Sequence, residues 1–349
     1  MAQGVSIVLR GRRNGTQPLL TSLSHIQRQV ARVPWEVVLV DNGDTDKAVR
    51  IALSSWEDCP IPIRIVRDGK LGLDQGVREA KYEVLGFLDD KSWIAPDWVQ
   101  MANDTFVRDP TLGAVGSVCE PVFEIPEPEW FRKCHALYAI LTESDLDQPP
   151  EPFAYLNGVG LCVRKSTWSQ LIQGGFRSLL DNELRGQPRE SIDAELTLAI
   201  RLAGWTIRAE RRLNLRRLIP AEHLRWMHLR RLQRGDAASR VLLDAYSSHN
   251  LSMRLGLKRR FRQLWWCQMG LSFMELAHLP RETITAVISK AENRQDVIEV
   301  ERIVGRILGL LRWRSRYGWS CRHVRYAPWR LRRPEEYLRQ PREPRVRYS

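Results

Sequence analysis

The sequence predicts an α/β fold with a doubly wound, mostly parallel sheet, followed by a helical and basic second half. Between residues 5 and 89, short apolar runs alternate with segments of helical character, and two of those runs end in a carboxylate. The formal charge of +13 is uneven, with much of the excess beyond Arg201. Parallel strands need crossover helices, so this alternation is typical of a doubly wound sheet.

The expected elements follow in order. Strands are predicted at 5–9, 36–41, 63–66 and 84–89, with helices at 18–30, 46–56 and 71–80 between them. Beyond this unit, helices are predicted at 96–108 and 190–203, and strands at 113–118 and 157–164. Residues 121–152 are rich in Pro, Glu and aromatic residues, and we expect them to form an ordered flap.

The fourth apolar run ends abruptly in Asp89 and Asp90. A buried strand tolerates no acid in its middle, so both carboxylates are expected at its carboxyl end, where open α/β sheets bind ligands. Adjacent carboxylates repel each other unless a cation, a sugar hydroxyl or a proton relieves them, and a hard divalent cation carrying a diphosphate would do so. The alternative is a plain turn or helix cap, in which paired Asp residues are common.

The composition is that of a globular protein in solution, with 43% hydrophobic and 27% charged residues. No apolar run approaches the roughly 20 residues of a membrane span, and the first residues lead straight into a strand, so a cytoplasmic location is expected. The six cysteines are scattered without a C-x-x-C pair, which argues against a zinc site or a disulfide framework.

The basic second half fits an anionic membrane surface, nucleic acid or a polyanionic substrate, and charge alone does not choose among them. A solvated helix face is the plain alternative. The predicted organisation is an α/β domain at 1–235, a helical basic region at 236–331 and an Arg/Pro-rich tail at 332–349.

Five segments carry a family resemblance, and they occur in the order 5–8, 38–46, 87–90 with 96–98, 157–160 with 163–164, and 193–196 leading to 201–205. In this order they resemble the GT-A (Rossmann-like) glycosyltransferases of family 2, which move a sugar from a nucleotide diphosphate-sugar to an acceptor. The resemblance covers roughly residues 5–235.

The resemblance implies where the donor binds. Asp41 would lie near the nucleobase with Asn42 beside it, Asp89 near the ribose, and Gly158 in the nucleotide-sugar site. Asp90 would ligate a divalent metal, Mn or Mg, that bridges the diphosphate.

The resemblance also implies that Asp193 is the general base and that Glu195 supports the acceptor or orients that base. A sugar hydroxyl is a poor nucleophile, so a carboxylate must take its proton in the transition state. The leaving diphosphate gathers charge that a metal and nearby cations stabilise. The alternative for Asp193 is an acid favoured in a first helical turn by the helix dipole.

The chain departs from the family pattern at Leu73, where an arginine is expected, at Ile192, where an acid is expected, and at Arg217, where a histidine is expected. Arg217, His223 and Trp130 are therefore candidate diphosphate or acceptor contacts. His223 is better explained as a packed or solvated helix residue, whereas Trp130 is equally well explained as a core anchor.

The predicted function is that of an inverting, metal-assisted glycosyltransferase of polysaccharide biosynthesis. Its acceptor would be a glycan or lipid-linked hydroxyl, and its place the cytoplasm, peripheral to the inner membrane face. One alternative is a catalytically weakened sugar-nucleotide-binding or scaffold protein. A nucleic-acid-binding protein is the other, and the strand-end acids argue against it because they would repel such a ligand. The oligomeric state stays open.

Overall fold

The structure is a computed structural model. It describes residues 2–11, 16–41, 50–51, 53–67, 74–147, 155–156, 158–180, 190–246, 264–280 and 291–330. Asn42 and the predicted tail at 332–349 lie outside the described residues.

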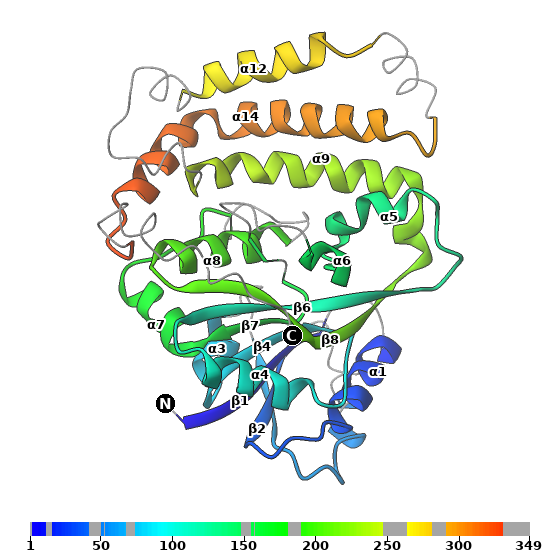
Figure 1. The fold of residues 1–349 in the computed structure, drawn as a ribbon, viewed down its shortest axis with the longest axis vertical. Coiled ribbons are helices and arrows are strands. Elements are labelled where there is room, and N and C mark those ends of the chain that lie inside the picture. The colour runs from blue at the N-terminus through cyan, green and yellow to red at the C-terminus, as the bar shows by residue number, and fades with distance from the viewer. Residues whose placement is uncertain are drawn as a thin grey trace.

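The described strands form one eight-stranded mixed sheet in the order β3-β2-β1-β4-β7-β6-β8-β5 (Figure 1). Neighbours are parallel in β1–β2, β1–β4, β2–β3 and β6–β8, and antiparallel in β4–β7, β6–β7 and β5–β8. The strands are β1 (Ala2–Arg10), β2 (Trp35–Asp41), β3 (Ile63–Arg67), β4 (Tyr82–Asp89), β5 (Ser92–Ile94), β6 (Leu112–Phe123), β7 (Leu161–Arg164) and β8 (Thr206–Ile219).

The first four strands confirm the predicted doubly wound unit. Their spatial order, β3-β2-β1-β4, reverses between β1 and β4, and a reversal of this kind opens a crevice at the carboxyl ends of the strands. The residues of β2 are all buried, as a parallel strand covered on both faces requires.

The second half of the sheet differs from the sequence prediction. β6 continues to Phe123 instead of ending at 118, and β5 and β8 were not predicted at all. β8 shows the alternation of a half-buried strand, with Leu213 and Leu215 inward and Asn214 and Arg216 outward. Arg217 falls at an inward position, where a charged residue hides the pattern.

Some helices lie next to the sheet, and three others, α9, α14 and α12, lie farther out (Figure 1). α9, α14 and α12 stack as successive layers beyond the other helices, and the predicted helix at 190–203 is confirmed as α8. The predicted flap at 121–152 holds short helical turns. The helices are α1 (Thr16–Gln27), α3 (Asp74–Glu79), α4 (Trp98–Arg108), α5 (Phe131–Cys134), η1 (His135–Tyr138), α6 (Glu143–Leu146), α7 (Lys165–Gln173), α8 (Glu190–Leu202), η2 (Ala221–Leu224), α9 (Trp226–Leu243), η3 (Asp244–Tyr246), α12 (Trp265–Ala277) and α14 (Gln295–Arg325).

Two hydrophobic clusters join the sheet to the helical layers. One includes Val5 of β1 together with Val297 of α14, and the other includes Val8 of β1 together with Leu310 of α14. The predicted domain boundary at 235 falls inside α9, which is one continuous helix.

Two glycines set the distance between α9 and α14. A Cβ at Gly305 would lie 2.3 Å from the backbone oxygen of Arg234, and one at Gly309 would lie 2.5 Å from that of Ala238. The two helix backbones therefore approach more closely than any side chain at these positions would permit. None of the helices among the described residues has the length and apolar character that crossing a membrane requires.

Candidate active site at the carboxyl edge of the sheet

Asp41 and Asp89 end two strands that flank β1, so both lie at one edge of the sheet. Asp41 is the last residue of β2 and Asp89 the last of β4, and each is at most 6% exposed. Register places Arg67 of β3 opposite Asp41, and Arg10 of β1 opposite Asp89. Acids and cations thus alternate along the edge that the sequence predicted as the ligand site.

The carboxylate of Asp89 is held from two sides. Its Oδ1 accepts hydrogen bonds from the Ser92 hydroxyl at 2.5 Å and from the Lys91 backbone N–H at 3.2 Å. Its Oδ2 pairs with the Arg217 guanidinium at 3.3 Å, and both side chains are at most 10% exposed. Arg217 is therefore a partner of a predicted donor-site carboxylate, which sequence reasoning did not foresee.

Asp90 follows directly and is fully buried at the same edge. Its carboxylate is the hard oxygen ligand that Mg²⁺ or Mn²⁺ prefers. Among the described residues, no group of three or more His, Cys, Asp and Glu side chains could hold a metal ion. These residues fit an ion that keeps water and takes most of its ligands from a diphosphate, as Mg²⁺ commonly does.

Asp193 of α8 reaches the same edge through Gly158. β7 runs antiparallel to β4, with Leu161 opposite Phe87, so β7 begins near the carboxyl end of β4 and the turn at 158–160 precedes it. An ideal Cβ at Gly158 would lie 1.6 Å from Oδ2 of Asp193, so the carboxylate rests directly on the glycine backbone. The registers thus bring Asp193 towards the strand end that carries Asp89.

Glu195, which was expected to support the acceptor or to orient the base, lies buried away from solvent. Its side chain is fully buried, and its carboxylate accepts hydrogen bonds from the Ser178 and Tyr246 hydroxyls and from the Leu179 backbone N–H. Residues two apart on a helix point about 200° apart, so Asp193 and Glu195 cannot face one ligand. Glu195 instead ties α8 to η3 and to the segment that precedes α8.

Burial raises the pKa of Glu195, although the hydrogen bonds from Ser178, Leu179 and Tyr246 oppose the shift. A raised pKa means that the folded protein holds this proton more tightly than the unfolded chain does. The contribution of Glu195 to the free energy of unfolding is therefore full below its ordinary pKa of 4.5 and is lost as the pH rises through the raised value.

Glu195→Gln, which stays neutral, is expected to flatten the dependence of Tm on pH above the ordinary glutamate pKa. Thermal unfolding across that range measures the effect, with Glu222→Gln as the control because the Glu222 side chain is 70% exposed. Parallel curves for wild type and Glu195→Gln would contradict the assignment.

Tyr138 connects the three candidate contact residues. Its backbone oxygen accepts a hydrogen bond from Nη1 of Arg217 at 3.0 Å, and its hydroxyl donates to the backbone oxygen of His223 at 2.8 Å. Its ring stacks on Trp130 at 6.3 Å between centroids. No sequence signal pointed to Tyr138, because the link runs largely through backbone atoms.

The structure places Trp130 in the core and His223 at the surface. Trp130 is 7% exposed and packs against Phe131 and Trp226, so it leaves little ring surface for a sugar. The His223 side chain is about one-third exposed and stacks on His228 at 4.5 Å. Of the three candidates, His223 alone offers substantial exposed surface to a ligand.

A cavity of about 750 Å³ lies beside β5 and β8. Arg216 lines it, while its neighbour Arg217 faces Asp89, because successive residues of a strand point to opposite faces. Trp93 and His25 stack in its wall at 5.8 Å. Burial, then Arg216 and Arg28, lower the pKa of His25, so its ring is neutral at pH 7. None of the predicted site residues lines this cavity.

Residues 12–153 match the family model described as Glycosyl transferase family 2. These residues form a family 2 glycosyltransferase domain. The predicted family and enzyme class are thereby confirmed, and an enzyme of this class transfers a sugar from a nucleotide-sugar. The chain matches no curated protein.

Two solved structures are similar to this chain. The mannosyltransferase PcManGT from Pyrobaculum calidifontis, in complex with GDP-Man and Mn²⁺, matches with 18% identity and a TM-score of 0.50, over 90% of this chain and 88% of that one. TarS 1–349 from S. aureus, in complex with UDP, matches with 13% identity and a TM-score of 0.46, over 89% and 91% of the two chains. The first likeness confirms the predicted GT-A fold.

Proposed function

We propose that this glycosyltransferase inverts the sugar that it transfers, with Asp193 as general base and a hydroxyl of a glycan or lipid-linked molecule as acceptor. The observation that carries the proposal is the contact of the Asp193 carboxylate with the Gly158 backbone, beside the strand end that bears Asp89 and Asp90. An inverting transfer needs one base on the acceptor side and a separate group on the diphosphate side, and this arrangement supplies both.

Different residues are proposed to bind the donor and to take the proton. Asp41 and Asp89 orient the nucleoside, and the rigid pairing of Asp89 with Arg217 and Ser92 keeps that part of the site preorganised. Asp193 takes the proton from the acceptor hydroxyl as it attacks the anomeric carbon. Arg10 and Arg67, at the strand ends beside these acids, are the cations proposed to face the diphosphate.

Asp90 is the residue proposed to hold a divalent metal, Mn or Mg, when the donor is bound. Such an ion stabilises the charge that develops on the leaving diphosphate. A complex of the neighbour PcManGT contains Mn²⁺ together with GDP-Man. Because the described residues offer no cluster of three metal-ligating side chains, we propose that the ion binds together with the nucleotide and not before it.

Metal and nucleotide are therefore expected to stabilise the enzyme only together. In a thermal-shift screen with GDP, UDP and their sugars, MnCl₂ alone should leave Tm unchanged. The correct nucleotide with MnCl₂, at a hundredfold excess over Kd, should raise the free energy of unfolding by about 2.7 kcal/mol. Asp90→Asn should remove the metal-dependent part of the shift.

The matched control for the screen is Asp104→Asn, which changes an acid on α4. Tight Mn²⁺ binding without a nucleotide would contradict ordered binding. The absence of any nucleotide-dependent shift across the screen would reject the proposed donor site itself.

The enzyme is further proposed to work in the cytoplasm, peripheral to the inner membrane face, and the basic second half supports this. The rival function is that of a weakened sugar-nucleotide binder or scaffold, which the burial of Arg217 against Asp89 favours because it removes one candidate diphosphate contact. Nucleotide-dependent stabilisation without transfer to any acceptor would select the rival.

A further inference from the structure

α12 exposes an apolar face to solvent. Among its exposed residues, five recur at positions i, i+4, i+7, i+8 and i+11, which form one stripe of a helix, while Leu271 and Glu275 are exposed outside this stripe. The five are Trp266, Gly270, Phe273, Met274 and Ala277, and we call them the α12 stripe. Trp266 and Phe273 are each 53% exposed and Met274 is 54% exposed. Large side chains exposed together on one helix face mark an interaction surface.

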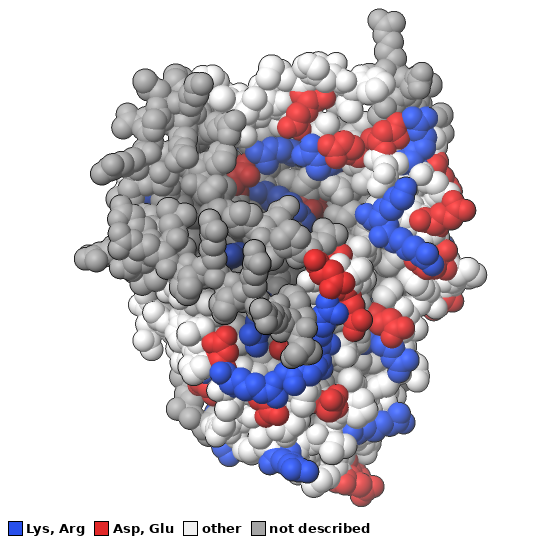
Figure 2. All heavy atoms as spheres, in the orientation of Figure 1, with Lys and Arg blue, Asp and Glu red and all other residues white. Residues whose placement is uncertain are grey.

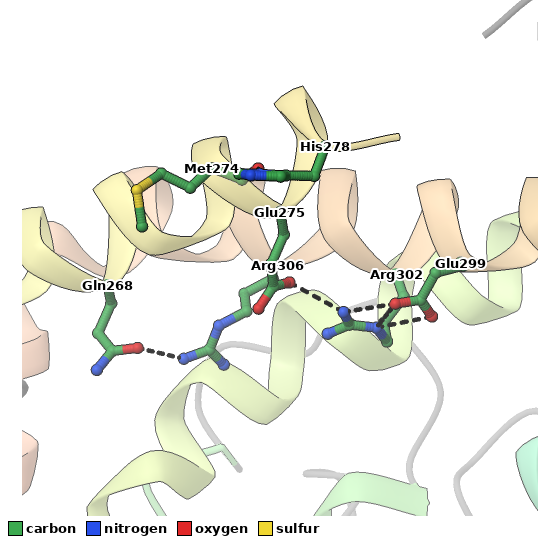
Figure 3. Close-up of polar contacts among 7 residues, drawn as sticks. All are labelled: Gln268, Met274, Glu275, His278, Glu299, Arg302 and Arg306. Carbon is green, nitrogen blue, oxygen red and sulfur yellow. Dashed lines mark hydrogen bonds and ion pairs between the residues drawn. The ribbon is translucent and has the colours of Figure 1, made fainter. Parts of the chain in front are cut away.

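The opposite side of α12 is fixed to α14 by polar contacts (Figure 3). Gln268 accepts a hydrogen bond from Arg306 at 2.9 Å, and Glu275 pairs with Arg302 at 3.0 Å. Met269 and Ser272 are buried beneath the helix. The polar contacts therefore lie on the inner side, so the stripe is not the packing face of α12.

The helix lies at the outside of the molecule, beyond α14 and α9 (Figure 1). The surface over it is largely neither acidic nor basic, whereas charged side chains of both signs are interspersed over the rest of the face in Figure 2. An apolar helix that lies along the outside of a protein has the shape that a flat lipid surface accepts.

The charge of the supporting helix selects the kind of lipid. α14 carries seven arginines and three acids, so its net charge is positive. Two of these arginines are paired with acids, Arg302 with Glu275 and Glu299, and Arg306 with Asp244. Glu275 is the one acid of α12. Positive charge behind an apolar face complements anionic headgroups. A second copy of this chain would bring the same positive charge and is disfavoured.

We propose that the α12 stripe docks this glycosyltransferase on an anionic lipid bilayer by burying Trp266, Phe273 and Met274 at the boundary between headgroups and acyl chains. This deepens the proposed function, because it names the surface at which the donor site would meet a lipid-linked acceptor. Insertion of the stripe supplies the affinity, and the positive charge selects an anionic lipid surface.

The test is co-sedimentation of the full chain with vesicles of phosphatidylcholine containing phosphatidylglycerol, and with vesicles of phosphatidylcholine alone. Wild type should bind the mixed vesicles and bind the neutral ones at least about tenfold more weakly. Phe273→Glu with Met274→Glu should lower binding to the mixed vesicles at least about tenfold, because each change removes an apolar side chain that the bilayer would otherwise bury. Val107→Glu is the matched control, since Val107 is 53% exposed on α4, and it should bind as wild type does.

Equal binding by the double variant and wild type would overturn the proposal, and so would equal binding to neutral and anionic vesicles. A dimer in light scattering that the double variant abolishes, without any vesicle binding, would assign the stripe to a second copy instead. Nucleotide-dependent thermal shifts measured on the same variants separate the two proposals. If those shifts persist while vesicle binding fails, only the docking face is rejected.

Discussion

Asp193→Asn is expected to lower kcat by about 10²-fold to 10⁴-fold, because the amide cannot take the proton of the attacking hydroxyl. Donor binding should survive, since the carboxylate rests on Gly158 and the amide has nearly the same size. Transfer from the donor that the screen selects measures kcat, and the thermal shift measures occupancy. In the wild-type product, the anomeric configuration should be inverted relative to the donor.

The control for this variant is Asp97→Asn, which changes an exposed acid just before α4. Normal activity in Asp193→Asn would place the base elsewhere. A lost thermal shift would make Asp193 a donor-binding residue, and a retained anomeric configuration would contradict the single-base mechanism.

Arg217→Met is expected to lower the free energy of unfolding by about 3–5 kcal/mol, because it leaves the Asp89 carboxylate buried without its cation. Urea denaturation of the full chain measures the change. Combining it with Asp89→Asn should recover much of the loss, because the remaining amide is neutral and can still accept from Ser92 and Lys91.

The neighbouring residue provides the control. Arg216 is exposed on the other face of β8, so Arg216→Met should change the free energy of unfolding by no more than about 0.5 kcal/mol. If Arg217→Met and Arg216→Met had the same free energy of unfolding, the ion pair between Arg217 and Asp89 would contribute little to stability. A double variant as unstable as Arg217→Met would assign the loss to the contact with Tyr138 instead.

The sequence predicted the first half of the fold well because its signals are local. The apolar runs of β1, β2 and β4 are nearly continuous, and Asp41 and Asp89 mark the ends of β2 and β4. β8 was missed for an opposite reason, since its residues 206–211 show no alternation and Arg217 stands at an inward position of the alternation that follows. That interruption is itself informative, because an inward charge needs a buried partner, and here the partner is Asp89.

The site was only partly predictable because orientation is a tertiary property. Asp193 and Glu195 look equivalent in the sequence, yet helix rotation sends one towards Gly158 and the other into a closed network with Tyr246. Trp130 could equally have been a sugar platform, and its burial against Trp226 decides for the core. Asp193 as base, Asp90 as metal ligand and Asp41 at the nucleobase stay predictions.

The contact between α9 and α14 limits how this chain can evolve. Most positions of the two helices can exchange one residue for another of similar size. A methyl group at Gly305 or Gly309 would collide with the main chain of α9, which, unlike a side chain, cannot rotate out of the way. Replacements there would require the helices to separate, and with them the clusters that anchor the outer layers to the sheet. Among descendants of this sequence, these two glycines should vary least outside the catalytic edge.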